Sequence, residues 1–160
     1  MYDYKSMTTS QNAITSSSDN SPLVSNTGAV LLAAGFSTRF GGIKLCAQLP
    51  NGNTLLQQSF LNIRQCTENI IVIGRKELLD AGVYAFLPTS HKPYLYLCDD
   101  ALSGMGHSLV CGIQQVPDDW RSAFICLGDM PFVSAKTMCA LFNAASSETI
   151  IMPTYQGERG

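Results

Sequence analysis

The sequence has little charge and lacks the clustered residues that polyanionic partners require. Only 14% of its 160 residues are Asp, Glu, Lys or Arg, the formal net charge is −2, and the ten Lys and Arg residues form no cluster. Nucleic-acid binding depends on a basic surface, so the sequence predicts no nucleic-acid partner. No apolar run approaches the length of a membrane span, which predicts no membrane partner.

The cysteines lack the spacing of a metal site. No Cys-x-x-Cys and no His/Cys cluster occurs, and the six are scattered, mostly within apolar segments: Cys46, Cys66, Cys98, Cys111, Cys126 and Cys139. This distribution predicts reduced, buried thiols in a cytoplasmic protein rather than a disulfide framework or a zinc site.

What the sequence does contain is enough apolar material for one folded domain. Apolar residues make up 46% of the chain, which fits a well-buried core at this length. The start of the chain differs, because its first 27 residues include seven Ser and four Thr and few apolar residues. We therefore expect residues 1–27 to be a disordered leader and residues 28–160 to form the domain.

Apolar runs and amphipathic segments alternate along the rest of the chain. Strands are expected at residues 29–34, 69–73, 94–97, 122–127 and 149–152, and helices at residues 54–66, 76–84, 105–115 and 134–144. This alternation predicts a three-layer α/β fold of Rossmann-like type, with a mostly parallel sheet and helices on both faces. Ligands of such folds bind at the carboxyl ends of the strands.

The first of these strands leads into a glycine-rich loop. Residues 31–44 read Leu-Leu-Ala-Ala-Gly-Phe-Ser-Thr-Arg-Phe-Gly-Gly-Ile-Lys. Glycines let backbone N–H groups approach phosphate oxygens, and Arg39 and Lys44 would neutralise their charge. The loop is not a Walker loop, because five residues separate its first two glycines and a third glycine stands where the lysine should be. The dinucleotide fingerprint Gly-x-Gly-x-x-Gly is also missing.

A carboxylate follows the strand expected at residues 122–127, in the run Leu-Gly-Asp-Met-Pro. An Asp after a strand is often a cap or turn residue. Beside a polyphosphate loop, however, Asp129 also suits Mg²⁺, which proteins hold with one or two carboxylates plus substrate phosphates. Asp99 and Asp100 follow another expected strand, from which they could reach the metal or the ribose. A cap or turn role is the favoured interpretation for them.

A third glycine-containing segment, residues 103–109, resembles a dinucleotide motif only superficially. Leu109 occupies the position of its third glycine, which argues against a dinucleotide site. His107 has no acidic or serine partner at triad spacing, so we interpret it as structural or peripheral.

Together these motifs resemble those of the nucleotidyltransferases that build molybdopterin dinucleotide cofactors, a resemblance that runs from residue 28 to residue 160. The loop is similar to the family signature Leu-Ala-Ala-Gly-x-Ser-x-Arg-x-Gly with a lysine a few residues on, at Leu32, Ala33, Ala34, Gly35, Ser37, Arg39, Gly41 and Lys44. Gly-Asp-Met-Pro looks like the family's metal-binding motif. Gly104 and Ser108 match its Gly-x-x-x-Ser-Leu segment, in which the start of a helix contacts the nucleotide.

The branch that the chain resembles uses cytidine. Guanine-using relatives usually read Leu-Ala-Gly-Gly in the loop and cytidine-using relatives Leu-Ala-Ala-Gly, so Ala34 indicates the second group. Residues 44–45 and 52–56 also look like the molybdenum cofactor cytidylyltransferases, whereas methylerythritol cytidylyltransferases usually carry Pro-Lys-Gln after the loop. Residues 155–160 look like a family segment that normally continues into His-Pro and several dozen further residues, so we expect the C-terminal part of the domain to be missing.

The resemblance implies transfer of CMP from CTP to the terminal phosphate of molybdenum-bound molybdopterin, with release of pyrophosphate and Mg²⁺ as cofactor. It implies that Asp129 holds the metal, that Lys44 stabilises charge at the α-phosphate, and that Arg39 and loop amides bind the leaving pyrophosphate. Two alternatives stay open. One is an enzyme of the same fold that uses another NTP or a sugar-phosphate acceptor. The other is a non-catalytic nucleotide-binding module whose partner is a molybdoenzyme or its maturation chaperone.

Overall fold

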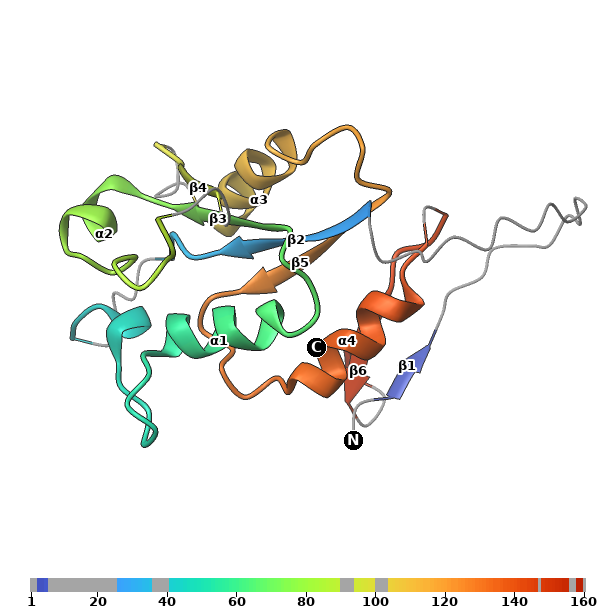
Figure 1. The fold of residues 1–160 in the computed structure, drawn as a ribbon, viewed down its shortest axis with the longest axis horizontal. Helices are drawn as coiled ribbons and strands as arrows, with labels where there is room; N and C mark the ends of the chain where they lie inside the picture. The colour runs from blue at the N-terminus through green and yellow to red at the C-terminus, as the bar shows by residue number, and fades with distance from the viewer. Residues whose placement is uncertain are drawn as a thin grey trace, which may run out of the picture.

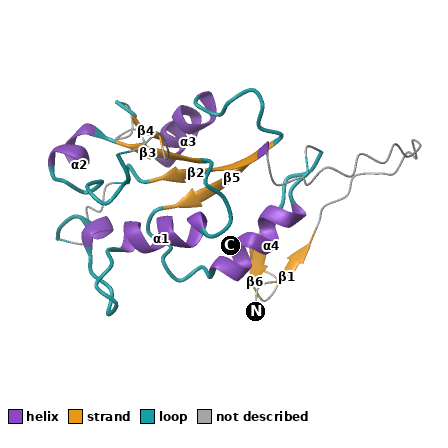
Figure 2. Cartoon of the chain, in the orientation of Figure 1, coloured by secondary structure: helices purple, strands orange, loops and turns teal. Residues whose placement is uncertain are grey.

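A four-stranded parallel sheet forms the centre of the molecule (Figures 1 and 2). The computed structural model describes residues 3–5, 26–35, 41–89, 94–99, 104–146, 148–155 and 158–159. The sheet has the order β4-β3-β2-β5, and all its pairs are parallel. Its strands are β2 (Thr27–Leu32), β3 (Ile70–Gly74), β4 (Tyr94–Leu97) and β5 (Ser122–Leu127).

Helices cover both faces of this sheet. α1 (Leu55–Arg64) and α4 (Ala135–Ala144) lie on one face and α3 (Met105–Gln114) on the other, while α2 (Lys76–Asp80) follows β3 (Figure 1). A short 3₁₀ turn, η2 (Lys44–Cys46), precedes α1. The predicted three-layer α/β fold with a parallel sheet is thereby confirmed.

Alternate residues of the central strands belong to two separate cores. Leu31 of β2 packs in the same cluster as Phe60 of α1 and Met138 of α4. Its neighbour Val30 packs in the second cluster, against which Leu109 of α3 lies. Because both faces are covered, β2 and β3 are buried along their whole length, as expected for central parallel strands.

Side-chain caps fix the starts of two helices where the sequence predicts them. The Oγ1 of Thr54 accepts a hydrogen bond of 3.1 Å from the N–H of Gln57 at the start of α1. The Oγ of Ser134 accepts one of 3.1 Å from the N–H of Thr137 at the start of α4. Each cap satisfies a backbone donor that a helix start otherwise leaves without an intrahelical partner.

The helix expected at residues 76–84 is shorter than predicted, because α2 ends at Asp80. Gly82 has φ +74°, in the left-handed region that ends a helix. The N–H of Val83 bonds to the carbonyl of Leu78 at 3.0 Å instead of continuing the helix, and residues 81–86 form turns.

The strand expected at residues 149–152 is wrong in both place and partner. Ile150 is 87% exposed, which does not fit a strand buried in a parallel sheet. The strand is β6 (Met152–Tyr155), which pairs antiparallel with β1 (Asp3–Lys5) and β7 (Glu158–Arg159) in a separate small sheet. Three residues of the expected leader therefore pair with the end of the domain. Most of its other residues lie outside the described part.

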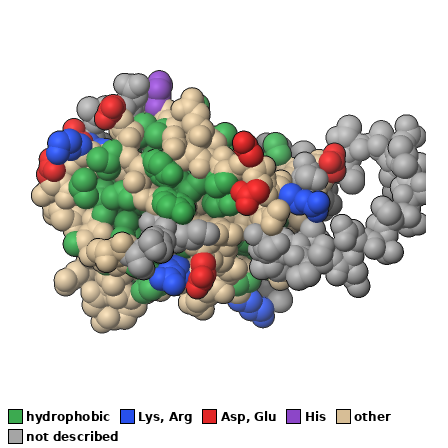
Figure 3. Space-filling model, turned by 45° about the horizontal axis from the view of Figure 1, so that its top comes forward, with side chains coloured by type: hydrophobic (Ala, Val, Ile, Leu, Met, Phe, Trp, Pro, Cys, Tyr) green, Lys and Arg blue, Asp and Glu red, His purple; other side chains and the backbone are tan. Residues whose placement is uncertain are grey.

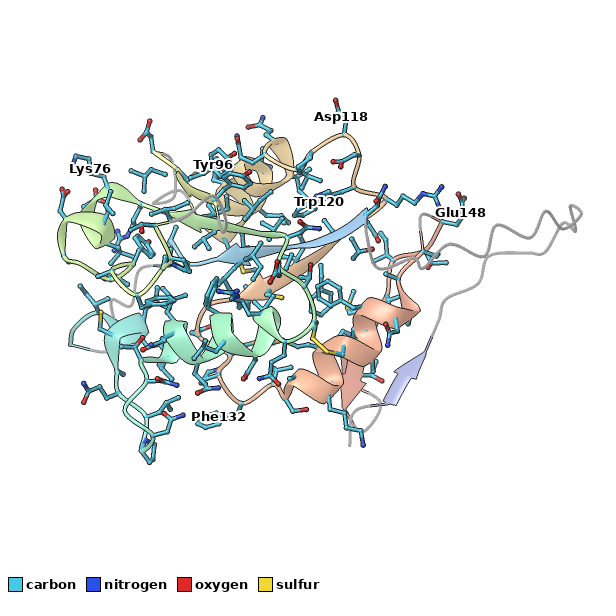
Figure 4. All side chains as sticks on the ribbon, in the orientation of Figure 1. Lys76, Tyr96, Asp118, Trp120, Phe132 and Glu148 are labelled. Carbon is cyan, nitrogen blue, oxygen red and sulfur yellow. A yellow bond between two sulfur atoms is a disulfide. The ribbon has the colours of Figure 1, made fainter. Side chains whose placement is uncertain are left out.

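The expectation of six reduced thiols is wrong for one pair. Cys66, just after α1, forms a disulfide with Cys139 of α4, and their Cα atoms are 5.2 Å apart (Figure 4). Among the free cysteines, Cys98 and Cys126 are buried as predicted, whereas Cys46 is exposed. Sequence spacing cannot reveal this pair, since 73 positions separate its members and only the packing of α1 against α4 brings them together.

Apolar side chains remain exposed on the outer elements. Tyr94 of β4 and Val110 and Ile113 of α3 are about half exposed. Figure 3 shows apolar side chains gathered on the face of the molecule where these elements lie. Within the described residues, no helix has both the length and the apolar character needed to cross a bilayer.

Candidate functional site

The carboxyl ends of all four parallel strands meet at one edge of the sheet. Beyond the strands, the N–H of Ala33 bonds to the carbonyl of Ile73 at 2.8 Å, and the N–H of Gly128 bonds to the carbonyl of Leu32 at 2.9 Å. The loops that follow β2, β3 and β5 therefore leave the sheet side by side. Ligands of such folds bind at this edge.

The glycine-rich loop begins at this edge. Leu32, Ala33 and Ala34 are buried at 8%, 0% and 2% exposure, and the chain reaches the surface at Gly35. Gly41 is exposed and has φ +69°, a conformation that glycine adopts without steric cost. The two remaining predicted loop residues, Ser37 and Arg39, lie outside the described residues.

Lys44 and Asp129 come together across the edge, although 85 positions separate them. The Nζ of Lys44 lies 2.7 Å from the Oδ2 of Asp129, an ion pair whose side chains are 39% and 38% exposed. Lys44 opens η2, and Asp129 lies in the turn after β5. A half-exposed pair contributes no more than about 1 kcal/mol to stability, so the contact does little for the fold.

Asp129 fits the way proteins hold Mg²⁺. The described residues contain no group of three His, Cys, Asp or Glu side chains that would bind a metal without other ligands. Mg²⁺ rarely needs such a group, because it takes one or two carboxylates and completes its shell with substrate phosphates and water. Asp99 is exposed at the end of β4, and Asp100 lies outside the described residues.

The start of α3 follows the end of β4 and contains the third predicted motif. Gly104 is the N-cap of α3 with φ +116°, a conformation that strongly favours glycine. Ser108, in the first turns of the helix, is 5% exposed, while His107 is exposed. The N–H of His107 already bonds to the carbonyl of Gly104 at 3.1 Å, so the donors at this helix start that lack an intrahelical acceptor are the amides of Met105 and Gly106.

Sequence reasoning missed a tyrosine that ties two strand ends together. The Oη of Tyr84 donates to the carbonyl of Ala33 at 2.9 Å and accepts from the N–H of Arg75 at 3.2 Å. Burial raises the pKa of Tyr84 to about 12. Tyr84 thus fixes the backbone from which the glycine-rich loop starts, and nothing in its local sequence distinguishes it from an ordinary core aromatic residue.

Two polar residues of α1, Ser59 and Asn62, were also missed as parts of the site. Both are buried and bond to the backbone of the loop that carries Asp129. The available signal was their position, because they are polar residues at the spacing of the apolar face of α1.

A hollow of about 330 Å³ lies away from this edge. It is lined by residues at the amino ends of β2 and β5, by the residues just after α1 and by part of α4, among them Thr27, Ser122, Gln65, Cys66, Cys139 and Phe142. Neither Lys44 nor Asp129 lines it. Its position at the opposite ends of the strands argues against a role in binding the phosphates of a nucleotide.

Residues 29–160 match the family model described as the MobA-like NTP transferase domain. Two curated relatives illustrate the range of similar proteins. The bifunctional protein GlmU of Rhodococcus jostii (strain RHA1) is 30% identical over 128 residues, which cover 76% of this chain and 25% of that protein. A probable molybdenum cofactor guanylyltransferase of Methanosarcina acetivorans is 25% identical over 133 residues, which cover 82% of this chain and 58% of that protein. The chain thus spans a quarter to somewhat over half the length of these relatives.

A solved structure has the same fold. The crystal structure of Rv0371c from Mycobacterium tuberculosis H37Rv superposes with a TM-score of 0.65 at 22% identity, covering 74% of this chain and 60% of that one. A second structure of Rv0371c, described as a complex with manganese, gives a TM-score of 0.60 at 22% identity, covering 74% and 59% of the two chains.

Proposed function

This chain belongs to the MobA-like NTP transferase family, and on that premise we propose that it transfers CMP from CTP to the terminal phosphate of molybdenum-bound molybdopterin. The bond from the α-phosphorus to the bridging oxygen breaks, a bond from the acceptor phosphate forms, and pyrophosphate leaves. The acceptor is already anionic, so the chemistry needs little proton transfer. Positioning and neutralisation of charge dominate such a reaction.

The observation that carries this proposal is the 2.7 Å contact between Lys44 and Asp129 at the carboxyl edge of the sheet. A cation and a carboxylate beside a glycine-rich loop are the two groups that nucleotidyl transfer needs. In the proposed complex the ammonium of Lys44 moves from the carboxylate to the α-phosphate and stabilises the charge that grows there. Arg39 and the amides at Gly35 and Gly41 bind the leaving pyrophosphate.

Asp129 is the proposed ligand of Mg²⁺. When bound, the ion neutralises the triphosphate and supplies the charge that a single lysine cannot. The manganese complex of Rv0371c supports a divalent ion in a protein of this fold. Asp129 is 38% exposed and therefore reachable by a metal–nucleotide complex.

The choice of CTP rests on Ala34, which gives the loop its resemblance to cytidine-using enzymes. GTP is the second candidate, because the Methanosarcina relatives are named as guanylyltransferases. The molybdopterin acceptor is supported by the same names. A cytoplasmic location is part of the proposal, although the Cys66–Cys139 disulfide removes one argument for it.

Pyrophosphate release tests the reaction and the base together. The purified chain is incubated with Mg²⁺, the molybdenum-bound pterin, and CTP, GTP, UTP or ATP in turn, and then with sugar phosphates as acceptors. We expect release with CTP and the pterin. Faster release with GTP would overturn the assignment of the base, and release with a sugar phosphate alone would overturn the acceptor. Nucleotide-dependent thermal stabilisation with no release from any pair would indicate a binding module.

A matched pair of lysine variants tests the site. We expect Lys44→Ala to lower the rate of pyrophosphate release by roughly 10²–10³, as the loss of a charge-stabilising donor typically does. Lys76, which pairs with Asp80 on α2 at 3.0 Å, is the control, and Lys76→Ala should release pyrophosphate at the wild-type rate. Equal rates in both variants would remove Lys44 from the proposed mechanism.

A further inference from the structure

A buried side-chain amide of α1, that of Asn62, bonds to the loop that carries Asp129. The Nδ2 of Asn62 donates to the carbonyls of Pro131 at 2.9 Å and of Val133 at 3.0 Å. Asn62 is only 7% exposed, and both hydrogens of its amide nitrogen are used. These two bonds fix the chain immediately after Asp129, in a stretch that contains no regular secondary structure.

The two carbonyls also determine the orientation of every amide in a longer chain of bonds. Carbonyl oxygens only accept, so the nitrogen of Asn62 must face them and its Oδ1 must accept. That Oδ1 accepts from the Nε2 of Gln58 at 2.8 Å, and the Oε1 of Gln58 is then left to accept. It accepts from the Nδ2 of Asn51 at 2.8 Å and from that of Asn53 at 3.0 Å. We call Asn51, Asn53, Gln58 and Asn62 the amide relay.

The far end of the amide relay lies close to Lys44 in the chain. Asn51 and Asn53 belong to a turn closed by a backbone bond of 2.8 Å between Leu49 and Asn53. The N–H of Leu55 at the start of α1 bonds to the carbonyl of Ala47 at 3.0 Å, directly after the 3₁₀ turn that Lys44 opens. The amide relay therefore joins the segment that follows Lys44 to the loop that carries Asp129.

A second contact from α1 to the same loop is weaker. The hydroxyl of Ser59 lies 3.1 Å from the carbonyl of Gly128 and 3.0 Å from that of Leu55, and a hydroxyl has one hydrogen to share between them. Gly128 is also held by its own N–H, which bonds to the carbonyl of Leu32 at 2.9 Å, and it packs closely on α1, because a Cβ there would meet the Cδ1 of Leu56 at 2.8 Å. Asn62, with two full bonds, is the stronger connection.

We propose that Asn62, oriented by Gln58, is a positioning residue that sets the place of the Asp129 carboxylate relative to Lys44. It does not touch the nucleotide itself, and it acts through the backbone of residues 128–133. The proposal rests on the proposed function, in which Asp129 binds the metal of a metal–nucleotide complex. Residues that orient a metal ligand typically change metal affinity about 10–100-fold when they are replaced.

The experiment measures Mn²⁺ binding by paramagnetic resonance in the presence of CTP, together with hydrogen exchange of the amides in residues 129–133. Asn62→Leu removes both donors at nearly constant volume. Asn62→Asp also keeps the volume but turns carboxylate oxygens toward the two carbonyls. We expect Mn²⁺ affinity to fall about 10–100-fold in Asn62→Leu and at least as far in Asn62→Asp, with faster exchange in the loop. Gln57→Leu, on the same helix and outside the amide relay, should bind Mn²⁺ as the wild type does.

Wild-type Mn²⁺ affinity in a folded Asn62→Leu variant would overturn the positioning role, even if the loop exchanged faster. Should that variant fail to fold, Gln58→Leu takes its place. It removes the donor to the Asn62 Oδ1 and the acceptor of Asn51 and Asn53, and it keeps both donors of Asn62. Wild-type affinity there would likewise overturn the proposal. Asp129→Asn distinguishes a failure of the proposed function from a failure of the positioning role. Unchanged Mn²⁺ affinity in that variant contradicts metal binding by Asp129 and not the hydrogen bonds of the amide relay.

Discussion

The two ends of the parallel sheet are held together in different ways. At the amino ends of β2 and β5, a disulfide joins Cys66 to Cys139 beside a hollow of about 330 Å³. At the carboxyl ends, hydrogen bonds from α1 and one half-exposed ion pair hold the loops. The first end is joined covalently, and the described residues that line its hollow are uncharged. The second end places Lys44 and Asp129 where a ligand can reach them.

This difference separates stability from function within one helix. α1 (Leu55–Arg64) begins beside the segment that follows Lys44 and leads into Cys66 at the amino ends of the strands. Asn62, one helical turn before Cys66, bonds to the loop that runs from Asp129 to α4. Changes at the amino end should therefore affect unfolding more than turnover. Changes to the exposed charges at the carboxyl end, Lys44 and Asp129, should do the reverse, because an exposed ion pair contributes little to stability.

The largest expected effect is on turnover, at Asp129. Asp129→Asn keeps the size of the side chain and removes its charge, so the proposed metal ligand is lost. We expect the rate of pyrophosphate release to fall by at least roughly 10²–10³, with a melting temperature close to that of the wild type. A variant that melts normally and turns over at a near-normal rate would refute the metal assignment.

The next effect is on stability, at the other end of the sheet. Replacing both Cys66 and Cys139 by Ser removes a cross-link between positions 73 residues apart. We expect the free energy of unfolding to fall by about 2–4 kcal/mol in denaturant titrations, with pyrophosphate release unchanged well below the melting temperature. Cys46→Ser, at an exposed free thiol, is the control and should alter neither quantity. Lost turnover in the folded double variant would mean that the two ends are not independent.

Tyr84 provides a test that depends on pH. Tyr84→Phe leaves the buried carbonyl of Ala33 without its 2.9 Å donor, which should cost about 1–3 kcal/mol of unfolding free energy. The folded state raises the pKa of Tyr84 from 10 to about 12, so the unfolded chain loses this proton first. The stabilisation that this pKa shift contributes is fully present below about pH 10 and is lost as the pH rises from about 10 to about 12.

Denaturant titrations across that range should therefore show a shallower alkaline loss of stability in Tyr84→Phe than in the wild type. The buried thiol of Cys126, whose pKa is raised to about 12, also makes stability fall with rising pH. This part of the alkaline loss is the same in the wild type and in Tyr84→Phe. Identical slopes in the two proteins would show that Tyr84 does not carry this dependence.

The smallest expected effect concerns a second lysine–aspartate pair, on α2. Lys76 and Asp80 lie one helical turn apart on α2, and their side chains are 71% and 61% exposed. Lys76→Ala should change the free energy of unfolding by about 0.5 kcal/mol or less. A larger loss, seen in the same denaturant titration, would show that exposed ion pairs matter more in this fold than we infer.

The sequence predicted what local patterns determine. Apolar runs located the four parallel strands, and Thr54 and Ser134 located two helix starts. The proximity of Lys44 and Asp129 followed from the rule that parallel strands end at one edge. The strand expected at residues 149–152 failed because an apolar run does not reveal its partners, and here they are β1 at the far end of the chain and β7.

Long-range packing produced the features that no local pattern revealed. Cys66 meets Cys139 only because α1 packs beside α4. Asn62 differs from an ordinary polar residue of a helix only through the two carbonyls that lie opposite it in the folded chain. Residues of this kind can be recognised only once the tertiary structure is known.

The most direct test of the central claim is a calorimetric titration of CTP into the protein with and without Mg²⁺. The claim is that Lys44 and Asp129 form one nucleotide site. We predict Mg²⁺-dependent binding in the wild type and in Lys76→Ala, and its loss in both Lys44→Ala and Asp129→Asn. Wild-type affinity for CTP in the Lys44→Ala and Asp129→Asn variants would contradict the claim.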